Sequence, residues 1–155
     1  MKKDEKSFKK GEVLREGEFE QRILDLARVT RVTGGGKHLR FRAFVLIGDR
    51  KGKVGWGLAK GADVAIAVNK AVRKAKKNLI TVPIINETIP REIRHKFCAA
   101  KILIKPAPKG TGIKAGGAIR AIFELAGVPN VVGKILGSNN KINNARAVFE
   151  AIEKL

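Results

Sequence analysis

Arginine and lysine residues are concentrated between residues 21 and 116, where twenty-two of them stand against five aspartates and glutamates. This segment carries nearly all of the chain's net charge of +19. A charge of that size repels itself in a compact chain, so it indicates a polyanionic partner. Nucleic acid is the commonest such partner, and a pI near 10.6 is typical of proteins that bind it. The chemistry that the composition predicts is therefore phosphate binding.

The strongest candidate for a phosphate-binding surface lies between Arg28 and Lys53. Arginine suits bidentate phosphate contacts, and only Asp25 and Asp49 offset the cations between residues 21 and 61. We expect these cations to form one continuous basic surface, and the alternative is a solvated charged face. In this half of the chain, the residues expected to bind RNA are Arg28, Arg31, Lys37, His38, Arg40, Arg42, Arg50, Lys51, Lys53 and Lys60.

A second group of candidates surrounds the glycine-rich segment 110–117, which opens a predicted helix. The N-terminus of a helix presents free amides that bind anions. The glycine spacing matches neither the dinucleotide fingerprint nor the nucleotide-binding P-loop. We therefore expect Lys109, Lys114 and Arg120 to lie near RNA phosphates, with a purely structural loop as the alternative.

Residues for catalysis or metal binding are poorly represented. His95 and Cys98 have the spacing of two zinc ligands, but nothing else in the chain supplies the remaining ligands. The pair is better explained as part of an ordinary edge strand. The only serines are Ser7 and Ser138, and no two carboxylates are placed to share a proton. We predict no catalytic residue, no metal site and no cofactor.

Three strands are predicted to position the first group of cations. Residues 19–33 are rich in Ile, Leu, Val and Thr, and a glycine run at 34–36 ends them. Apolar residues then alternate from Leu39 to Ile47, which indicates a half-buried strand with Arg40 and Arg42 on the far face. A turn at 48–52 leads into a third strand at 53–59. Consecutive strands joined by tight turns predict an antiparallel meander.

A helix is predicted after Asp63, which is a plausible N-cap. Apolar residues recur at helical spacing from Val64 to Leu79 and would lie on the sheet. Cations late in a helix complement its dipole, but five cations exceed what a dipole needs. These five, on the other face, are Lys70, Arg73, Lys74, Lys76 and Lys77.

A second unit is expected after a domain join between Ile85 and Pro90. We divide the chain into a mobile charged tail at 1–18, a first domain at 19–85 and a second domain at 86–155. A short strand at 80–85 ends the first domain. The second contains a strand at 97–105, a loop at 106–116, a helix at 117–126, a strand at 131–136 and a helix at 142–155. The fold class is α+β, with a three-stranded meander plus helix followed by a small strand-helix-strand-helix domain.

The location expected from composition is the cytoplasm. Cys98 is the only cysteine, so no intrachain disulfide can form and a reducing compartment is expected. The N-terminus lacks the apolar run of a signal peptide. No apolar stretch reaches 18 residues, so we predict no membrane span.

Six short segments of the chain together resemble a known family. They are Arg28–Lys37 with Phe41-Arg42-Ala43, Gly48–Gly57, and a set in the second half: Gly110–Arg120, Ala126-Gly127-Val128 and Gly137–Asn140. In this order they resemble bacterial small-subunit ribosomal protein five. The similarity runs from about Glu18 to the end of the chain.

The resemblance implies a first domain similar to double-stranded-RNA-binding folds and a second α+β domain shared with unrelated enzymes. It implies contact with 16S rRNA and ribosomal proteins four and eight, a position near the mRNA entry region, and effects on decoding accuracy. The loop 29–37 would lie near the spectinomycin pocket. Three positions depart from the family pattern: Gly34 replaces a common Lys, Ala59 a frequent Gly, and Ala65 a frequent Pro.

From these observations we predict a non-enzymatic constituent of the small ribosomal subunit that binds 16S rRNA and contributes to assembly and translational accuracy. Charge alone does not choose rRNA over another RNA duplex, so that choice rests on the resemblance. One alternative is a free-standing RNA-binding or RNA-chaperone module. Another is a small-molecule kinase or ATPase, for which the chain supplies no nucleotide loop. DNA binding is disfavoured, since no base-reading recognition helix stands out.

Overall fold

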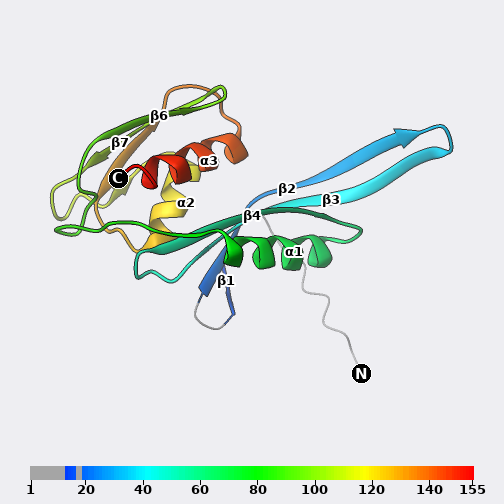
Figure 1. The fold of residues 1–155 in the computed structure, drawn as a ribbon, viewed down its shortest axis with the longest axis horizontal. Coiled ribbons are helices and arrows are strands. Elements are labelled where there is room, and N and C mark those ends of the chain that lie inside the picture. Colours follow the sequence, from blue (N-terminus) through cyan, green and yellow to red (C-terminus); the bar gives the residue numbers. More distant parts are fainter. Residues whose placement is uncertain (1–12, 17–18) are drawn as a thin grey trace.

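The computed structural model describes residues 13–16 and 19–155, which build two sheets with three helices packed around them (Figure 1). The first sheet is antiparallel throughout and has the order β1-β2-β3-β4-β5. Its core, β2-β3-β4, is the predicted meander. The strands are β1 (Val13–Glu16), β2 (Phe19–Thr33), β3 (Gly36–Gly48), β4 (Lys53–Gly61) and β5 (Leu79–Thr81).

The edge strand β1 falls in the segment that the sequence analysis assigned to a mobile tail. Residues 13–16 pair with the start of β2, from Val13 opposite Arg22 to Glu16 opposite Phe19. An exposed edge of a sheet offers unpaired amides and carbonyls, which this short segment satisfies. The segment predicted as a tail therefore contains a paired edge strand at Val13–Glu16. Residues 1–12 and 17–18 lie outside the described residues, and the mobility expected of them stays a prediction.

Helix α1 (Val64–Lys77) packs on one face of the first sheet. It begins as predicted, because the Asp63 carboxylate accepts a hydrogen bond of 2.7 Å from the Val64 amide. The helix lies very close to β4. A methyl group on Gly57 would approach the Ala71 carbonyl oxygen to 1.9 Å. The absence of a side chain at Gly57 therefore lets helix and strand meet backbone to backbone.

The body of β3 is buried on both faces, not half-buried as predicted. Ala43, Val45 and Ile47 face α1, whereas Phe44 and Leu46 face the second unit, and none exceeds 1% exposure. The alternation was read as one apolar face because the far face also carries Arg40 and Arg42. Those arginines lie nearer the start of β3, before the part that the second unit covers. The first sheet is thus the central layer between α1 and the second unit (Figure 1).

The second sheet has the order β6-β7-β9-β8, with only the β8–β9 pair parallel. Helices α2 (Gly117–Ala126) and α3 (Lys141–Ile152) pack against it and against the first sheet. Both helices were predicted, and the bounds of α2 were predicted correctly. The strands are β6 (Ile93–Phe97), β7 (Ala100–Pro106), β8 (Ile113–Lys114) and β9 (Val131–Ile135).

Two strand predictions need correction. The strand expected at 97–105 is a hairpin of β6 and β7, because Cys98 adopts a left-handed φ of 50° and allows a two-residue turn. The strand expected at 80–85 is only Leu79–Thr81, since its partner β4 begins at Lys53, opposite Thr81. Beyond that point the edge has no strand to pair with.

The two units are joined by an aromatic and cationic contact. The Arg146 guanidinium carbon of α3 lies 4.9 Å from the centroid of the Trp56 ring of β4. The Trp56 ring also lies 5.9 Å from Phe44 and 6.3 Å from Phe149, centroid to centroid. Cation–π attraction is strongest where water is excluded, so this cluster holds α3 against the first sheet. The domain boundary placed at 85/86 stays a prediction.

Among the described residues, none of the three helices combines the length and hydrophobicity needed to cross a lipid bilayer.

Candidate nucleic-acid interface

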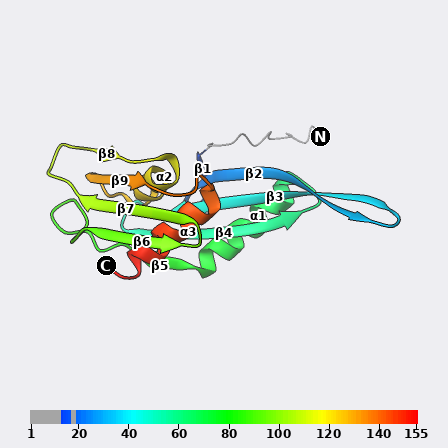
Figure 2. The same cartoon turned by 90° about the horizontal axis from the view of Figure 1, so that it is seen from above.

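The most prominent feature of the surface is a two-stranded extension, the arm, formed by residues 28–41 of β2 and β3. The arm projects away from both units and ends in the turn Gly34-Gly35 (Figures 1 and 2). Its apolar side chains are not buried, since Val32 is 71% exposed and Leu39 is 54% exposed. A strand pair without a core of its own is marginal in water, so this exposed extension is a candidate interface.

Strand register places most of the predicted cations of the arm on one face. Arg31 pairs with His38, Val29 with Arg40, and Arg42 with Lys60. Paired residues point to the same side of a sheet, and residues two apart do as well. This face continues the side of the sheet that the second unit covers elsewhere. It carries a groove of about 580 Å³, the arm groove, lined by Val29, Thr30, Arg31, Thr33, His38, Arg40 and Lys60.

The charges of the arm groove are mostly uncompensated. Within residues 13–16 and 19–155, no ion pair is formed by Arg31, Arg40 or Lys60. Arg42 differs, because its guanidinium lies 3.3 Å from the Asp25 carboxylate and is only partly exposed. Arg42 therefore helps to hold the base of the arm, whereas Arg31, Arg40 and Lys60 stay without an ion pair among the described residues.

Two predicted cations lie on the opposite face of the arm. Arg28 pairs with Phe41 and Lys37 with Val32, which places them on the side of the sheet that carries α1. Both are exposed. The cations of the arm are therefore divided between the two faces of the strand pair.

Arg50, Lys51 and Lys53 lie at the other end of β3, in and after the β3–β4 turn. The turn is held against α2, since the Arg50 amide donates to the Leu125 carbonyl at 3.0 Å. The Arg50 side chain is paired with Glu20 at 2.8 Å. Strands rise about 3.3 Å per residue, so roughly 35 Å separates Lys37 from this turn. The single continuous surface expected from the sequence is therefore not formed.

The predicted cations of the second unit are dispersed, and two are paired. Lys109 lies 3.3 Å from the Glu87 carboxylate, and Arg120 lies 2.6 Å from Glu124. Lys114 is exposed on β8. Partial burial would raise the pKa of Glu124, but hydrogen bonds from Arg120 and Arg22 outweigh it and lower that pKa. The Arg22–Glu124 pair also joins β2 to α2.

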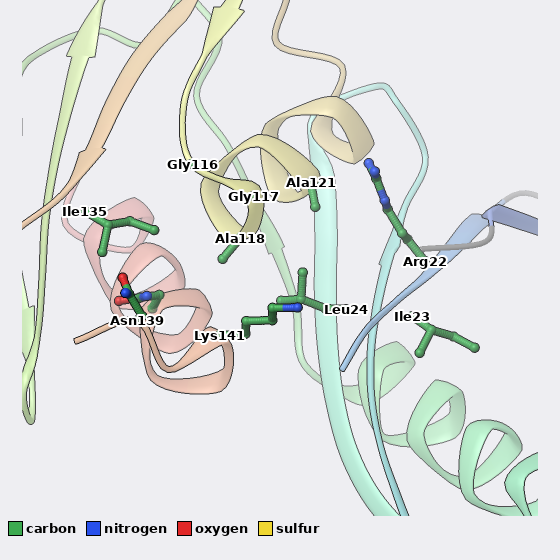
Figure 3. A pocket seen from close by; sticks show the side chains of 11 residues that line it. Arg22, Ile23, Leu24, Gly116, Gly117, Ala118, Ala121, Ile135, Asn139 and Lys141 are labelled. Carbon is green, nitrogen blue, oxygen red and sulfur yellow. The ribbon is translucent and has the colours of Figure 1, made fainter. Parts of the chain in front are cut away.

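A second groove of about 520 Å³ lies between β2 and the N-termini of α2 and α3 (Figure 3). Gly116 caps α2 without a side-chain hydrogen bond, so the free amides expected of the glycine-rich segment open here. Lys109 and Lys114 do not line this groove, whereas Arg22 and Lys141 do. The sequence analysis did not single out these two residues. They come together only through docking of the two units, which no local pattern reveals.

Among the residues that the structure describes, no three His, Cys, Asp or Glu side chains gather in a way that could hold a metal ion. His95 lies in the edge strand β6 and contacts the Glu150 carboxylate at 2.9 Å. Cys98 is exposed in the following turn. The pair thus belongs to an ordinary edge hairpin, as expected.

Comparison with known protein families gives two matches. Residues 19–83 match the model of "Ribosomal protein S5, N-terminal domain", and residues 95–155 match that of "Ribosomal protein S5, C-terminal domain". The first match contains the arm and α1, and the second contains α2 and α3. The matches stand in the expected order and cover most of the chain. The chain therefore belongs to the ribosomal protein S5 family and is a ribosomal protein of the small subunit.

Proposed function

We propose that this protein is a non-enzymatic, structural constituent of the small subunit that binds 16S rRNA through the arm. The observation that carries the proposal is the arm groove, where Arg31, Arg40 and Lys60 line one hollow and form no ion pair with any residue that the structure describes. Phosphate contacts position a protein on RNA, and folded RNA is recognised largely by shape and backbone. The family supplies the choice of ribosomal RNA over other RNA.

The remaining predicted contacts belong to the same proposal. Arg28 and Lys37 would reach RNA from the opposite face of the arm. Arg50, Lys51 and Lys53 would meet a different part of the rRNA, because the β3–β4 turn lies far from the arm. Lys109, Lys114 and Arg120 would add contacts from the second unit. Through these contacts the protein would support subunit assembly and translational accuracy.

Ribosomal proteins four and eight, and mRNA near its entry region, are the further partners that we propose. The support for protein neighbours is apolar surface on and beside the second unit. Leu136 is 59% exposed and Ile85 is 53% exposed, and both lie outside the RNA-facing arm. A cytoplasmic location within the ribosome follows from the same proposal.

Sedimentation tests the proposal directly. Tagged full-length protein in a cell lysate is expected to travel with the small subunit in a sucrose gradient. A variant with Arg31→Gln, Arg40→Gln and Lys60→Gln is expected to shift toward the top of the gradient. If the unchanged protein never enters the small-subunit peak but binds isolated duplex RNA, a free-standing RNA-binding or chaperone module would explain the chain instead.

A further inference from the structure

The outward face of α1 carries five cations that the arm does not use. Lys70, Arg73, Lys74, Lys76 and Lys77 are all exposed, and α1 contains no Asp or Glu. No ion pair in the described part of the chain involves any of the five. Lys70, Arg73 and Lys77 stand at i, i+3 and i+7, so they form one stripe along the helix. We call the five residues the α1 patch.

The helix dipole does not account for the α1 patch. Cations complement the dipole only within the last turn, which holds Lys74, Lys76 and Lys77. Lys70 and Arg73 precede that turn. Like charges three and four residues apart destabilise an isolated helix, so the cluster works against its own helix. An external polyanion would remove that repulsion.

The α1 patch is held rigidly. On its inner side, α1 rests on β4 with almost no side chains between them. A methyl group on Gly55 would lie 2.5 Å from the Ala75 carbonyl oxygen, and one on Gly61 would lie 2.6 Å from the Ala67 amide nitrogen. Because close-packed backbones leave no space for the helix to tilt, the backbone positions that carry the five cations are fixed relative to the first sheet. Pre-organised charges lose less entropy on binding.

The α1 patch faces away from the arm groove. Arg40 and Lys60 lie on the face of the first sheet that the second unit covers, whereas α1 covers the other face. Figure 1 shows α1 and the second unit on opposite sides of β4. One RNA segment lying in the arm groove would therefore not reach the α1 patch.

We propose that the α1 patch binds the phosphate backbone of a second RNA segment, so that the first sheet holds two RNA segments on its opposite sides. The inference rests on the proposed function of the arm. An acidic protein is the less suitable occupant, since lysine is depleted in protein interfaces and the only large apolar side chain exposed on α1 is Ile66. The lysine-rich stripe suits phosphates as point charges rather than base edges.

The salt dependence of binding to protein-free small-subunit rRNA tests the proposal. The test variant carries Lys70→Gln, Arg73→Gln and Lys77→Gln, since Gln retains helix propensity. Three lost phosphate contacts should lower the slope of log K against log salt by about 2.1–2.7. The arm variant should lose a similar amount, and the two losses should add when the six changes are combined.

A charge-matched control distinguishes the effect of where the cations lie from the effect of the total charge of the protein. Lys96, Lys101 and Lys134 are exposed cations of the second sheet, and their replacement by Gln removes the same charge. The control should keep the slope of the unchanged protein. The proposal would be overturned if the control variant lost as much of the salt slope as the α1 variant. It would also be overturned if the slope of the α1 variant were unchanged. This second outcome holds even if the α1 variant no longer enters small-subunit particles, since that loss would then come from a missing protein contact.

The outcomes also separate this inference from the proposed function. An α1 variant with an unchanged slope refutes the α1 patch and leaves the arm standing if the arm variant is impaired. Unchanged full-length protein that does not bind the rRNA refutes both. Thermal unfolding followed by circular dichroism should show that the α1 variant melts close to the unchanged protein, because the relief of repulsion among the three cations offsets the lost interaction of Lys77 with the helix dipole.

Discussion

Removing the three unpaired cations of the arm groove should weaken rRNA binding by a calculable amount. Arg31, Arg40 and Lys60 line one groove and have no ion-pair partner among the described residues. Their replacement by Gln removes three charges without exposing an unpaired carboxylate. Each phosphate contact contributes about 0.7 to the salt slope for single strands and about 0.9 for duplexes. The slope should therefore fall by about 2.1–2.7.

The same slopes set the loss of affinity. Because the contribution scales with salt concentration, the variant should bind about 100- to 500-fold more weakly at 0.1 M salt and nearly equally well at 1 M. A loss of that size corresponds to about 3–4 kcal/mol. The variant with Lys96, Lys101 and Lys134 replaced by Gln provides the matched control, and it should change little.

Filter binding of labelled small-subunit rRNA at several salt concentrations is the suitable assay. The reasoning would be refuted by an arm variant whose slope equals that of the unchanged protein. It would also be refuted by equal losses in the arm variant and the control, since binding would then follow total charge and not the geometry of the groove.

Three further predictions concern single positions. Gly34→Lys meets open space and should raise the salt slope of rRNA binding by about 0.7–0.9; no increase would place the arm tip away from RNA. Gly57→Ala should lower the free energy of unfolding in urea by about 1–3 kcal/mol, because its methyl group meets the Ala71 carbonyl, and Gly34→Ala should not. The lowered pKa of Glu124 means stability that is present above its ordinary value of 4.5 and lost as pH falls through the lowered value. In the Glu124→Gln variant the free energy of unfolding should therefore fall less steeply as the pH is lowered. Identical acid-unfolding curves for the variant and the unchanged protein would contradict the lowered pKa of Glu124.

Local patterns predicted those elements whose ends are marked by special residues. Helix α2 ends at Gly127, which adopts a left-handed φ of 76° as a C-cap. Helix α1 begins at the Asp63 cap. Strand β2 was bounded correctly by the glycine run that turns the arm. Each of these signals acts within a few residues, so one sequence is enough to read it.

Contacts between segments that are distant in the sequence could not be predicted from such local patterns. The second buried face of β3 depends on Phe44 meeting residues of the second unit such as Phe123. The ion pair of Arg22 with Glu124 joins residues 102 positions apart. Alternation along a strand shows which residues share a face, but not what covers it. For the same reason the sequence predicted the cations of the arm and those of the β3–β4 turn as one surface.

The sequence predicted which residues belong to the candidate site better than it predicted how they are arranged in space. Arg31, His38, Arg40 and Lys60 were all named, and the structure brings them into one groove. Arg42 was named as well, but it is partly neutralised by Asp25. Composition identifies a cation without showing its partner. Register between strands then decides which cations act together.

Cross-linking of protein to RNA in intact small subunits, followed by mass spectrometry of the cross-linked peptides, tests the central claim most directly. The arm groove is expected to yield nucleotide adducts on peptides covering residues 28–42, and these adducts should disappear in the Arg31, Arg40 and Lys60 variant. Particles that contain the protein but give nucleotide adducts only on the outer strands of the second sheet would contradict the claim.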